Sequence, residues 1–132
     1  MKAKKYLGYL YTLILIVLLS KVCFSQNTPA EDDQYLAFAT TMPELDGGMA
    51  ELSKKIKYPS IAKQTNTEGK VYAMAYVDDK GNVDKVKIIK GLGAGCDEEV
   101  VRVLSTSKFK PGQHEGKTVK VKTTISVVFK LK

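Results

Sequence analysis

The chain has 132 residues, of which 44% are apolar and 27% are charged, with a formal net charge of +7. This length suits one domain, and the composition excludes a collagen-like, coiled-coil or wholly disordered chain. Two cysteines and one histidine are too few for a disulfide framework or a multi-histidine metal site, so neither is expected.

Residues 1–25 have the pattern of a secretory signal peptide. Lysines precede the uncharged stretch 7–19, and small residues stand one and three positions before a cut at Gln26. One alternative is a retained short membrane anchor, but Lys21 interrupts the stretch before the roughly 20 apolar residues that a span needs. Another is lipidation of Cys23, which lacks small residues directly before it. We expect cleavage and export.

Cleavage would remove four of the 21 basic residues and none of the 14 acidic ones, leaving 17 against 14, a net charge of +3. Much of the basic character therefore belongs to the leader, and nucleic-acid binding is not expected. Residues 26–41 are polar and are expected to form a tether to a domain at 42–132. Acidic neighbours would raise the pKa of Cys96, so we interpret this thiol as a packing residue.

Two short helices are expected at the start of the domain. The first follows Gly47 and Gly48, where apolar residues recur at spacings of three and four. The second begins at Pro59, because proline suits a first helical position, and reaches about residue 65. The side chains expected to face the core are Met49, Leu52, Ile56, Ile61 and Ala62.

A β-hairpin and a third helix follow. Strands at 70–77 and 83–90 are expected to flank a loop that turns at Gly81. The glycine-rich stretch 91–95 is interpreted as a flexible connection, because the acidic residues after it would repel phosphate. Asp97 is expected to cap a helix that runs to about residue 105.

The clearest strand signal lies at 119–131. Apolar side chains alternate there with polar ones, and Val128 is the only apolar residue at an even position. Such alternation is typical of a half-buried antiparallel strand. The element order predicts an α+β fold: a three-stranded antiparallel sheet with helices packed on one face.

The sequence gives no support for catalysis. His114 stands in a glycine-flanked turn without nucleophile or acid partners, and the acidic pairs have plain roles in a tether, a turn and a helix start. The loop at 78–82 lacks the later glutamate of a calcium loop. We therefore expect no enzyme activity, no cofactor and no metal site.

A series of short motifs occurs in a specific order between residues 42 and 132. These are Tyr58-Pro59, Gly69-Lys70-Val71, the segment 77–83, Asp97-Glu98-Glu99, the segment 109–112, and Val128-Phe129-Lys130-Leu131. In this order the chain resembles the C-terminal domain of TonB energy transducers, in the form found in Bacteroidetes-like bacteria.

The resemblance implies a periplasmic domain that binds outer-membrane TonB-dependent transporters through their TonB-box segments. The last strand would be a sheet edge to which the transporter peptide adds as a further strand. The partner-binding residues that it implies are Tyr58, Pro59, Val119, Lys120, Val121, Lys122, Thr123, Thr124, Ile125, Ser126, Val127, Val128 and Phe129. Lys120, Lys122 and Lys130 would steer acidic segments, or would equally serve as ordinary solvated edge lysines.

Several features distinguish the chain from full transducers. No long proline-rich spacer precedes the domain, and the leader has no histidine for the proton-driven inner-membrane motor. We expect a short stand-alone form, with coupling to that motor in doubt. A retained leader would instead anchor it in the inner membrane, facing the periplasm.

A second hypothesis concerns the first strand of the hairpin. Tyr72, Met74 and Tyr76 are expected on the open face of the sheet, where they would support a homodimer. The plain alternative is that these three side chains belong to the core. On the second hypothesis the domain is a periplasmic adaptor or scaffold without energy coupling.

Overall fold

The computed structural model describes Gly8 and residues 31–132. The predictions for the leader and for the first residues of the tether therefore lie outside the described residues. No helix in the described part of the chain is long and apolar enough to cross a membrane.

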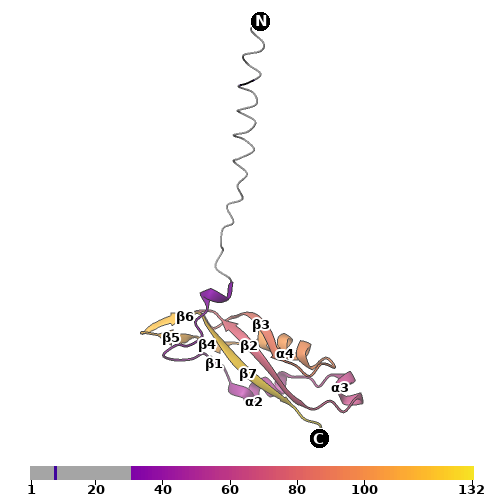
Figure 1. Ribbon diagram of the computed structural model, residues 1–132. Helices are drawn as coiled ribbons and strands as arrows, with labels where there is room; N and C mark the ends of the chain where they lie inside the picture. Colours follow the sequence, from indigo (N-terminus) through magenta and orange to yellow (C-terminus); the bar gives the residue numbers. More distant parts are fainter. Residues whose placement is uncertain (1–7, 9–30) are drawn as a thin grey trace.

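The described elements form a mixed α+β domain (Figure 1). A three-stranded antiparallel sheet has the order β3-β2-β7, and β1 with β4 and β5 with β6 form two smaller antiparallel pairs. The predicted α+β class and three-stranded antiparallel sheet are confirmed. The elements are η1 (Glu31–Gln34), β1 (Glu44–Leu45), α2 (Gly48–Lys55), α3 (Ser60–Gln64), β2 (Gly69–Val77), β3 (Val83–Lys90), α4 (Cys96–Ser105), β4 (Phe109–Lys110), β5 (Gly112–His114), β6 (Lys117–Val119) and β7 (Val121–Phe129).

The core lies between the sheet and α4. The odd-numbered residues of β2 point toward this helix, and Ala73 and Ala75 are fully buried there with small side chains that let α4 approach. Cys96 at the start of α4 is also fully buried. Burial, with Asp97 and Glu98 nearby, raises the pKa of the Cys96 thiol, which agrees with a packing role.

The first two helices bury fewer residues than their patterns predict. Leu52 and Ala62 are buried, but Met49 is 44% exposed and Ile61 is 61% exposed, so the inward placement of these two is wrong. The physical reason is length: α2 has eight residues and α3 five, and each presents only one buried position.

The predicted cap of α4 is also wrong. The helix begins at Cys96 after Gly95, whose φ of 86° is left-handed. The carboxylate of Asp97 instead accepts hydrogen bonds from the backbone N–H groups of Leu92 at 2.9 Å and Gly93 at 3.4 Å. Asp97 therefore closes the glycine-rich loop that leads into the helix.

The single long strand predicted at 119–131 is interrupted at Lys120. Val119 ends β6 and pairs with Gly112 in β5, whereas β7 begins at Val121 and pairs with β2. The alternation continues across this break, which is why the sequence pattern does not reveal it.

The β2–β3 hairpin turns as predicted, and its glycine also contacts a distant strand. Gly81 has a φ of +85°, and its carbonyl accepts a hydrogen bond from the N–H of Phe109 at 2.9 Å. A Cβ atom at this position would lie only 1.9 Å from the carbonyl oxygen of Phe109. The turn and β4 can therefore meet only if residue 81 has no side chain.

We expect Gly81→Ala to lower the free energy of unfolding by roughly 3 kcal/mol or more, because left-handed strain and a backbone clash add. Gly93→Ala is the matched control: its φ is +70°, but a Cβ there meets nothing within 4 Å. This control should cost about 1–2 kcal/mol from the backbone conformation alone. Urea denaturation of both variants measures the difference, and equal losses would contradict the clash.

A half-buried carboxylate, that of Glu99, joins α4 to the segment before α3. Glu99 accepts hydrogen bonds from Arg102 Nε at 2.9 Å and Nη2 at 2.6 Å, and from the backbone N–H of Lys57 at 2.7 Å. The bonds from Arg102, and then that from Lys57, outweigh burial and hold the pKa of Glu99 below its ordinary value of 4.5.

This lowered pKa predicts an acid-sensitive contribution to stability. The contribution is complete above pH 4.5 and is lost as pH falls through the lower folded-state pKa of Glu99. Glu99→Gln should therefore be less stable than the wild type at pH 7, and the gap should narrow below pH 4.5. Denaturant titrations from pH 7 to pH 3 measure the gap; a constant gap would contradict the prediction.

Candidate functional site

Strand β7 lies at an edge of the main sheet. One side of it pairs with β2 in continuous register, from Val77 opposite Val121 to Gly69 opposite Phe129. In the sheet order β3-β2-β7 no strand follows it. The structure therefore places the closing strand where the sequence predicts it, with one side of its backbone turned away from the sheet.

Two hydrogen bonds with Leu36 identify which backbone groups of β7 point away from β2. Leu36 donates its N–H to the carbonyl of Lys120 at 2.9 Å, and Lys122 donates its N–H to the carbonyl of Leu36 at 3.0 Å. Successive residues of a strand direct these groups to opposite sides. The N–H and C=O groups of Thr124, Ser126 and Val128 therefore also point outward.

Within residues 31–132, no backbone hydrogen bond reaches these three outward residues from beyond the sheet. The open edge thus spans 124–128, which is shorter than the 119–129 implied by the family resemblance. Val121, Ile125, Val127 and Phe129 have buried side chains. The backbone groups of these odd-numbered residues face β2, and their side chains are buried. Neither is therefore available to a binding partner.

Residues 31–41, here called the strap, pack against the domain. Leu36 pairs with β7, and Thr41 exchanges two backbone hydrogen bonds with Gln113 of β5, at 2.8 and 2.9 Å. The strap runs close to Gly112 of β5. A Cβ atom on this glycine would lie 3.1 Å from the carbonyl oxygen of Thr41 in the strap and 2.8 Å from Val121 Cγ2. The prediction that these residues form a tether is therefore wrong from residue 31 onward.

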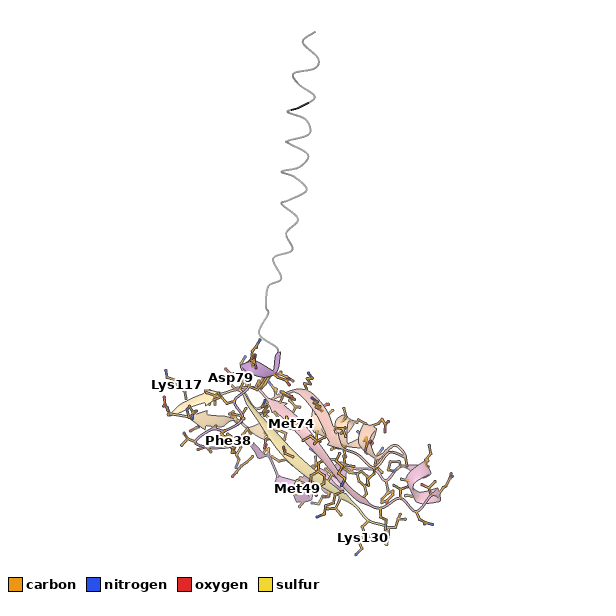
Figure 2. All side chains as sticks on the ribbon, viewed as in Figure 1. Phe38, Met49, Met74, Asp79, Lys117 and Lys130 are labelled. Carbon is orange, nitrogen blue, oxygen red and sulfur yellow. The ribbon has the colours of Figure 1, made fainter. Side chains whose placement is uncertain are left out.

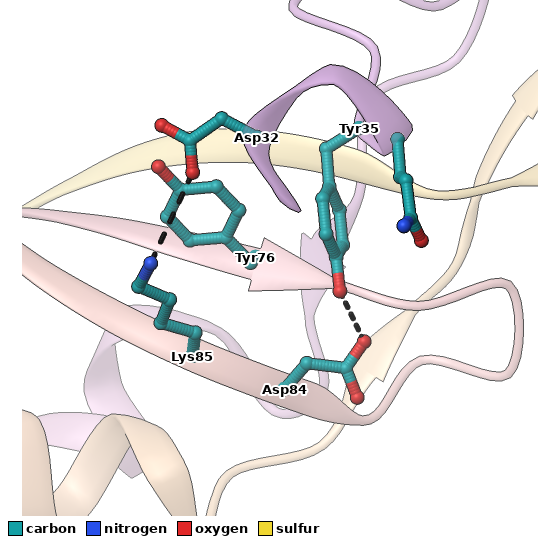
Figure 3. A pocket seen from close by; sticks show the side chains of 6 residues that line it. Asp32, Tyr35, Tyr76, Asp84 and Lys85 are labelled. Atoms are coloured by element: carbon teal, nitrogen blue, oxygen red, sulfur yellow. Dashed lines mark hydrogen bonds and ion pairs between the residues drawn. The ribbon is translucent and has the colours of Figure 1, made fainter. Parts of the chain in front are cut away.

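The strap also covers part of the open face of the sheet (Figure 3). The ring of Tyr35 meets that of Tyr76 edge-on, with centroids 5.1 Å apart, and its hydroxyl donates to the carboxylate of Asp84. The Nζ atom of Lys85 lies 5.4 Å from the centroid of the Tyr76 ring and 3.9 Å from Asp32 Oδ1. Burial, then a hydrogen bond with Asp32, raises the pKa of Tyr76.

Tyr76 is only 2% exposed, so the prediction that it lies on an open aromatic face is wrong. The reason is the strap, which supplies Tyr35 as its cover. Tyr72 and Met74 are half-buried. Self-association through these residues stays a prediction. The sequence signal for this cover is the group of large apolar residues Tyr35, Leu36 and Phe38 within a polar stretch.

Tyr58 and Pro59 lie near the far end of β7. The Tyr58 ring meets that of Phe129 edge-on at 5.6 Å, and its hydroxyl donates to the carbonyl of Thr67. Pro59 packs against the turn before α4, where a Cβ on Gly95 would lie 3.1 Å from it. Both residues thus have structural contacts here, and their role in partner binding stays a prediction.

A groove adjoins the open edge on the helix side of the sheet. It has a volume of about 360 Å³, and its wall opposite β7 comes from β1 and α2. Met49, whose side chain is labelled in Figure 2, belongs to this wall. The lining residues are Pro43, Glu44, Leu45, Gly48, Met49, Phe109, Thr123, Thr124 and Ile125.

The single histidine of the chain, His114, is not among the residues that line the groove beside the open edge. His114 is exposed on β5, and its ring Nδ1 lies 3.3 Å from Thr40 Oγ1. Among residues that the structure describes, no three His, Cys, Asp or Glu side chains are grouped to hold a metal ion. The open edge and its groove are therefore the candidate functional site.

The chain is similar to known proteins in sequence and in structure. A family model described as the Gram-negative bacterial TonB protein C-terminal matches residues 54–131, more than half of the chain. The NMR structure of the Helicobacter pylori TonB C-terminal domain is 20% identical, with a TM-score of 0.50, over 63% of this chain and 88% of that one. The NMR structure of the Pseudomonas aeruginosa TonB C-terminal domain is 24% identical, with a TM-score of 0.48, over 58% of this chain and 79% of that one. No curated protein sequence matches the chain.

The alternation along β7 predicts a specific pattern of amide hydrogen exchange. The amides of Thr124, Ser126 and Val128 should exchange faster than those of their odd-numbered neighbours, while Lys122 should be protected by its bond to Leu36. Leu36→Pro keeps the carbonyl that accepts from Lys122 but removes the N–H that donates to Lys120, which is one of the two hydrogen bonds between Leu36 and β7. The strap should then detach from β7 more often, and exchange at Lys122 should speed roughly tenfold. Uniform protection along β7, measured by NMR, would contradict an open edge.

Proposed function

The chain belongs to the family of Gram-negative bacterial TonB C-terminal domains, and from this premise we propose that it binds outer-membrane TonB-dependent transporters by strand addition. Domains of this family are periplasmic and interact with outer-membrane receptors. The proposal assigns the TonB-box segment of the transporter to the outer side of β7, with residues 1–25 as the export signal.

The observation that carries the proposal is the open edge at Thr124, Ser126 and Val128. These residues offer N–H and C=O groups in a row, which is the pattern that an extended peptide pairs with. Their side chains are exposed and have no large charged group that would obstruct a neighbouring strand. Binding of this kind requires no chemical step, so the proposed role is that of a binding domain and not an enzyme.

Main-chain pairing also suits the transmission of force. Hydrogen bonds distributed along a strand share a load, whereas a contact at one side chain does not. We therefore include in the proposal a role in energy-coupled transport across the outer membrane, with this domain as the part that holds the transporter. A connection to the inner-membrane proton-driven motor would depend on residues outside those that the structure describes.

The lysines near the edge would assist the first association of a partner segment with β7. Lys122 and Lys130 belong to β7 and its continuation, and Lys120 lies 5.6 Å from the centroid of the Tyr35 ring. Positive charge beside the edge attracts an acidic segment and raises its association rate in a salt-dependent way. Lysines on an edge also discourage unwanted pairing between copies, so one arrangement serves both purposes.

Proline at position 126 tests the proposal directly. Ser126→Pro removes an outward N–H but leaves the pairing with β2 intact, because that residue does not donate to β2. We expect affinity for TonB-box peptides from transporters of the same organism to fall roughly tenfold or more. Isothermal titration calorimetry measures this loss.

Ser126→Thr is the matched control, since it keeps the N–H and adds only one methyl group; its affinity should equal that of the wild type. Circular dichroism establishes that both variants fold. Unchanged peptide affinity in Ser126→Pro would overturn binding at this edge.

A further inference from the structure

The groove beside β7 lies where the side chains of an added strand would project. Thr123 and Ile125 belong both to β7 and to the groove wall, and Pro43, Leu45 and Met49 form its opposite side. The groove is therefore continuous with the open edge. A strand added there would have an apolar surface beneath it.

The geometry of a sheet determines which partner residue enters the groove. Residues opposite each other on neighbouring strands point to the same face, whether the strands are parallel or antiparallel. The side chain of Ile125 is buried on the helix side. A partner residue opposite Thr123 or Ile125 would therefore direct its side chain to that side, into the groove, and its two neighbours would face away.

The protein itself shows that this edge accepts an extended segment. The strap already pairs with β7 through Leu36, immediately before the open stretch. That pairing ends at Lys122, so a partner strand has the positions from 123 onward available. The groove begins at the same point, since its first lining residue on β7 is Thr123.

The lining defines the chemistry of the side chain that would fit. Met49 is 44% exposed, so an added apolar side chain would remove accessible apolar surface from water. Glu44 is an exposed acid in the same lining, and it would repel a second carboxylate. The preferred occupant is therefore an aliphatic side chain, and an acidic one is disfavoured.

This inference rests on the strand addition proposed above. We propose that the groove beside β7, whose far wall comes from β1 and α2, is a specificity pocket for one side chain of the partner strand. It selects partner strands that carry an aliphatic residue, such as valine, leucine or methionine, opposite Thr123–Ile125. The open edge supplies sequence-independent pairing, and the groove supplies discrimination between partner sequences.

A host–guest peptide series tests this pocket with the full chain. The probe is a seven-residue peptide of threonine and serine with one central guest residue, which is leucine, threonine or glutamate. The leucine peptide should bind about tenfold more tightly than the threonine peptide, and the glutamate peptide should bind most weakly. NMR titration follows the amides of Thr124, Ser126 and Val128 and gives the affinities.

Variants locate the preference in the groove. Met49→Gln should abolish the advantage of the leucine guest, and Met49→Leu should keep it. Ile61→Gln is the matched control, because Ile61 is also an exposed apolar helix residue but lies on α3, outside the groove. Glu44→Gln should relieve the discrimination against the glutamate guest.

The outcomes separate this inference from the proposed function. If all three peptides shift the β7 amides with equal affinity, strand addition stands and the pocket is wrong. A leucine preference that survives Met49→Gln also overturns the pocket. If no peptide shifts the amides of Thr124, Ser126 or Val128, the edge itself fails as a binding site, and the proposed function fails with it.

Discussion

The backbone of β7 is hydrogen-bonded to its own sheet on one side only, and the proposed function depends on this constraint. A peptide group needs a partner on each side, from protein or from water, so an unpaired row remains available for another chain. Odd- and even-numbered residues of β7 therefore have different roles. Ile125 and Val127 hold the strand to the core, while Thr124, Ser126 and Val128 present the outward groups.

One continuous segment, residues 35–49, defines both limits of this open stretch. Its first part pairs through Leu36 and closes the edge before residue 123. Its second part, from Pro43 through α2, forms the far wall of the groove beside the remaining edge. Gly112 favours this route, because a Cβ there would lie 2.8 Å from Val121 Cγ2, closer than real contacts allow, and 3.1 Å from the carbonyl oxygen of Thr41. The length of the binding site and its side-chain chemistry are thus set by the same piece of chain.

The parts of the fold that the sequence predicts are those with local signals. The hairpin turned at Gly81, the helix at 96–105 and the alternation along β7 each depend on residues close together in the chain, and each is confirmed. The tether expected at residues 26–41 is wrong from residue 31 onward, because the strap makes contacts between residues far apart in the chain, such as Tyr35 with Tyr76 and Leu36 with Lys120. Periodicity contains no information about such pairings. The same limit explains why the sequence pattern reveals neither the pairing of Leu36 with β7 nor the groove beside the edge.

Backbone pairing alone would hold a partner only weakly. Three outward residues offer three N–H and three C=O groups, hence six hydrogen bonds at most. At about 1 kcal/mol net for each bond, their sum is roughly 6 kcal/mol. Association costs about 4–15 kcal/mol in lost translational and rotational freedom, so this sum leaves little surplus. Burial of one aliphatic side chain contributes about 1.5–3 kcal/mol. On this comparison, a groove beside the edge contributes affinity as well as selectivity.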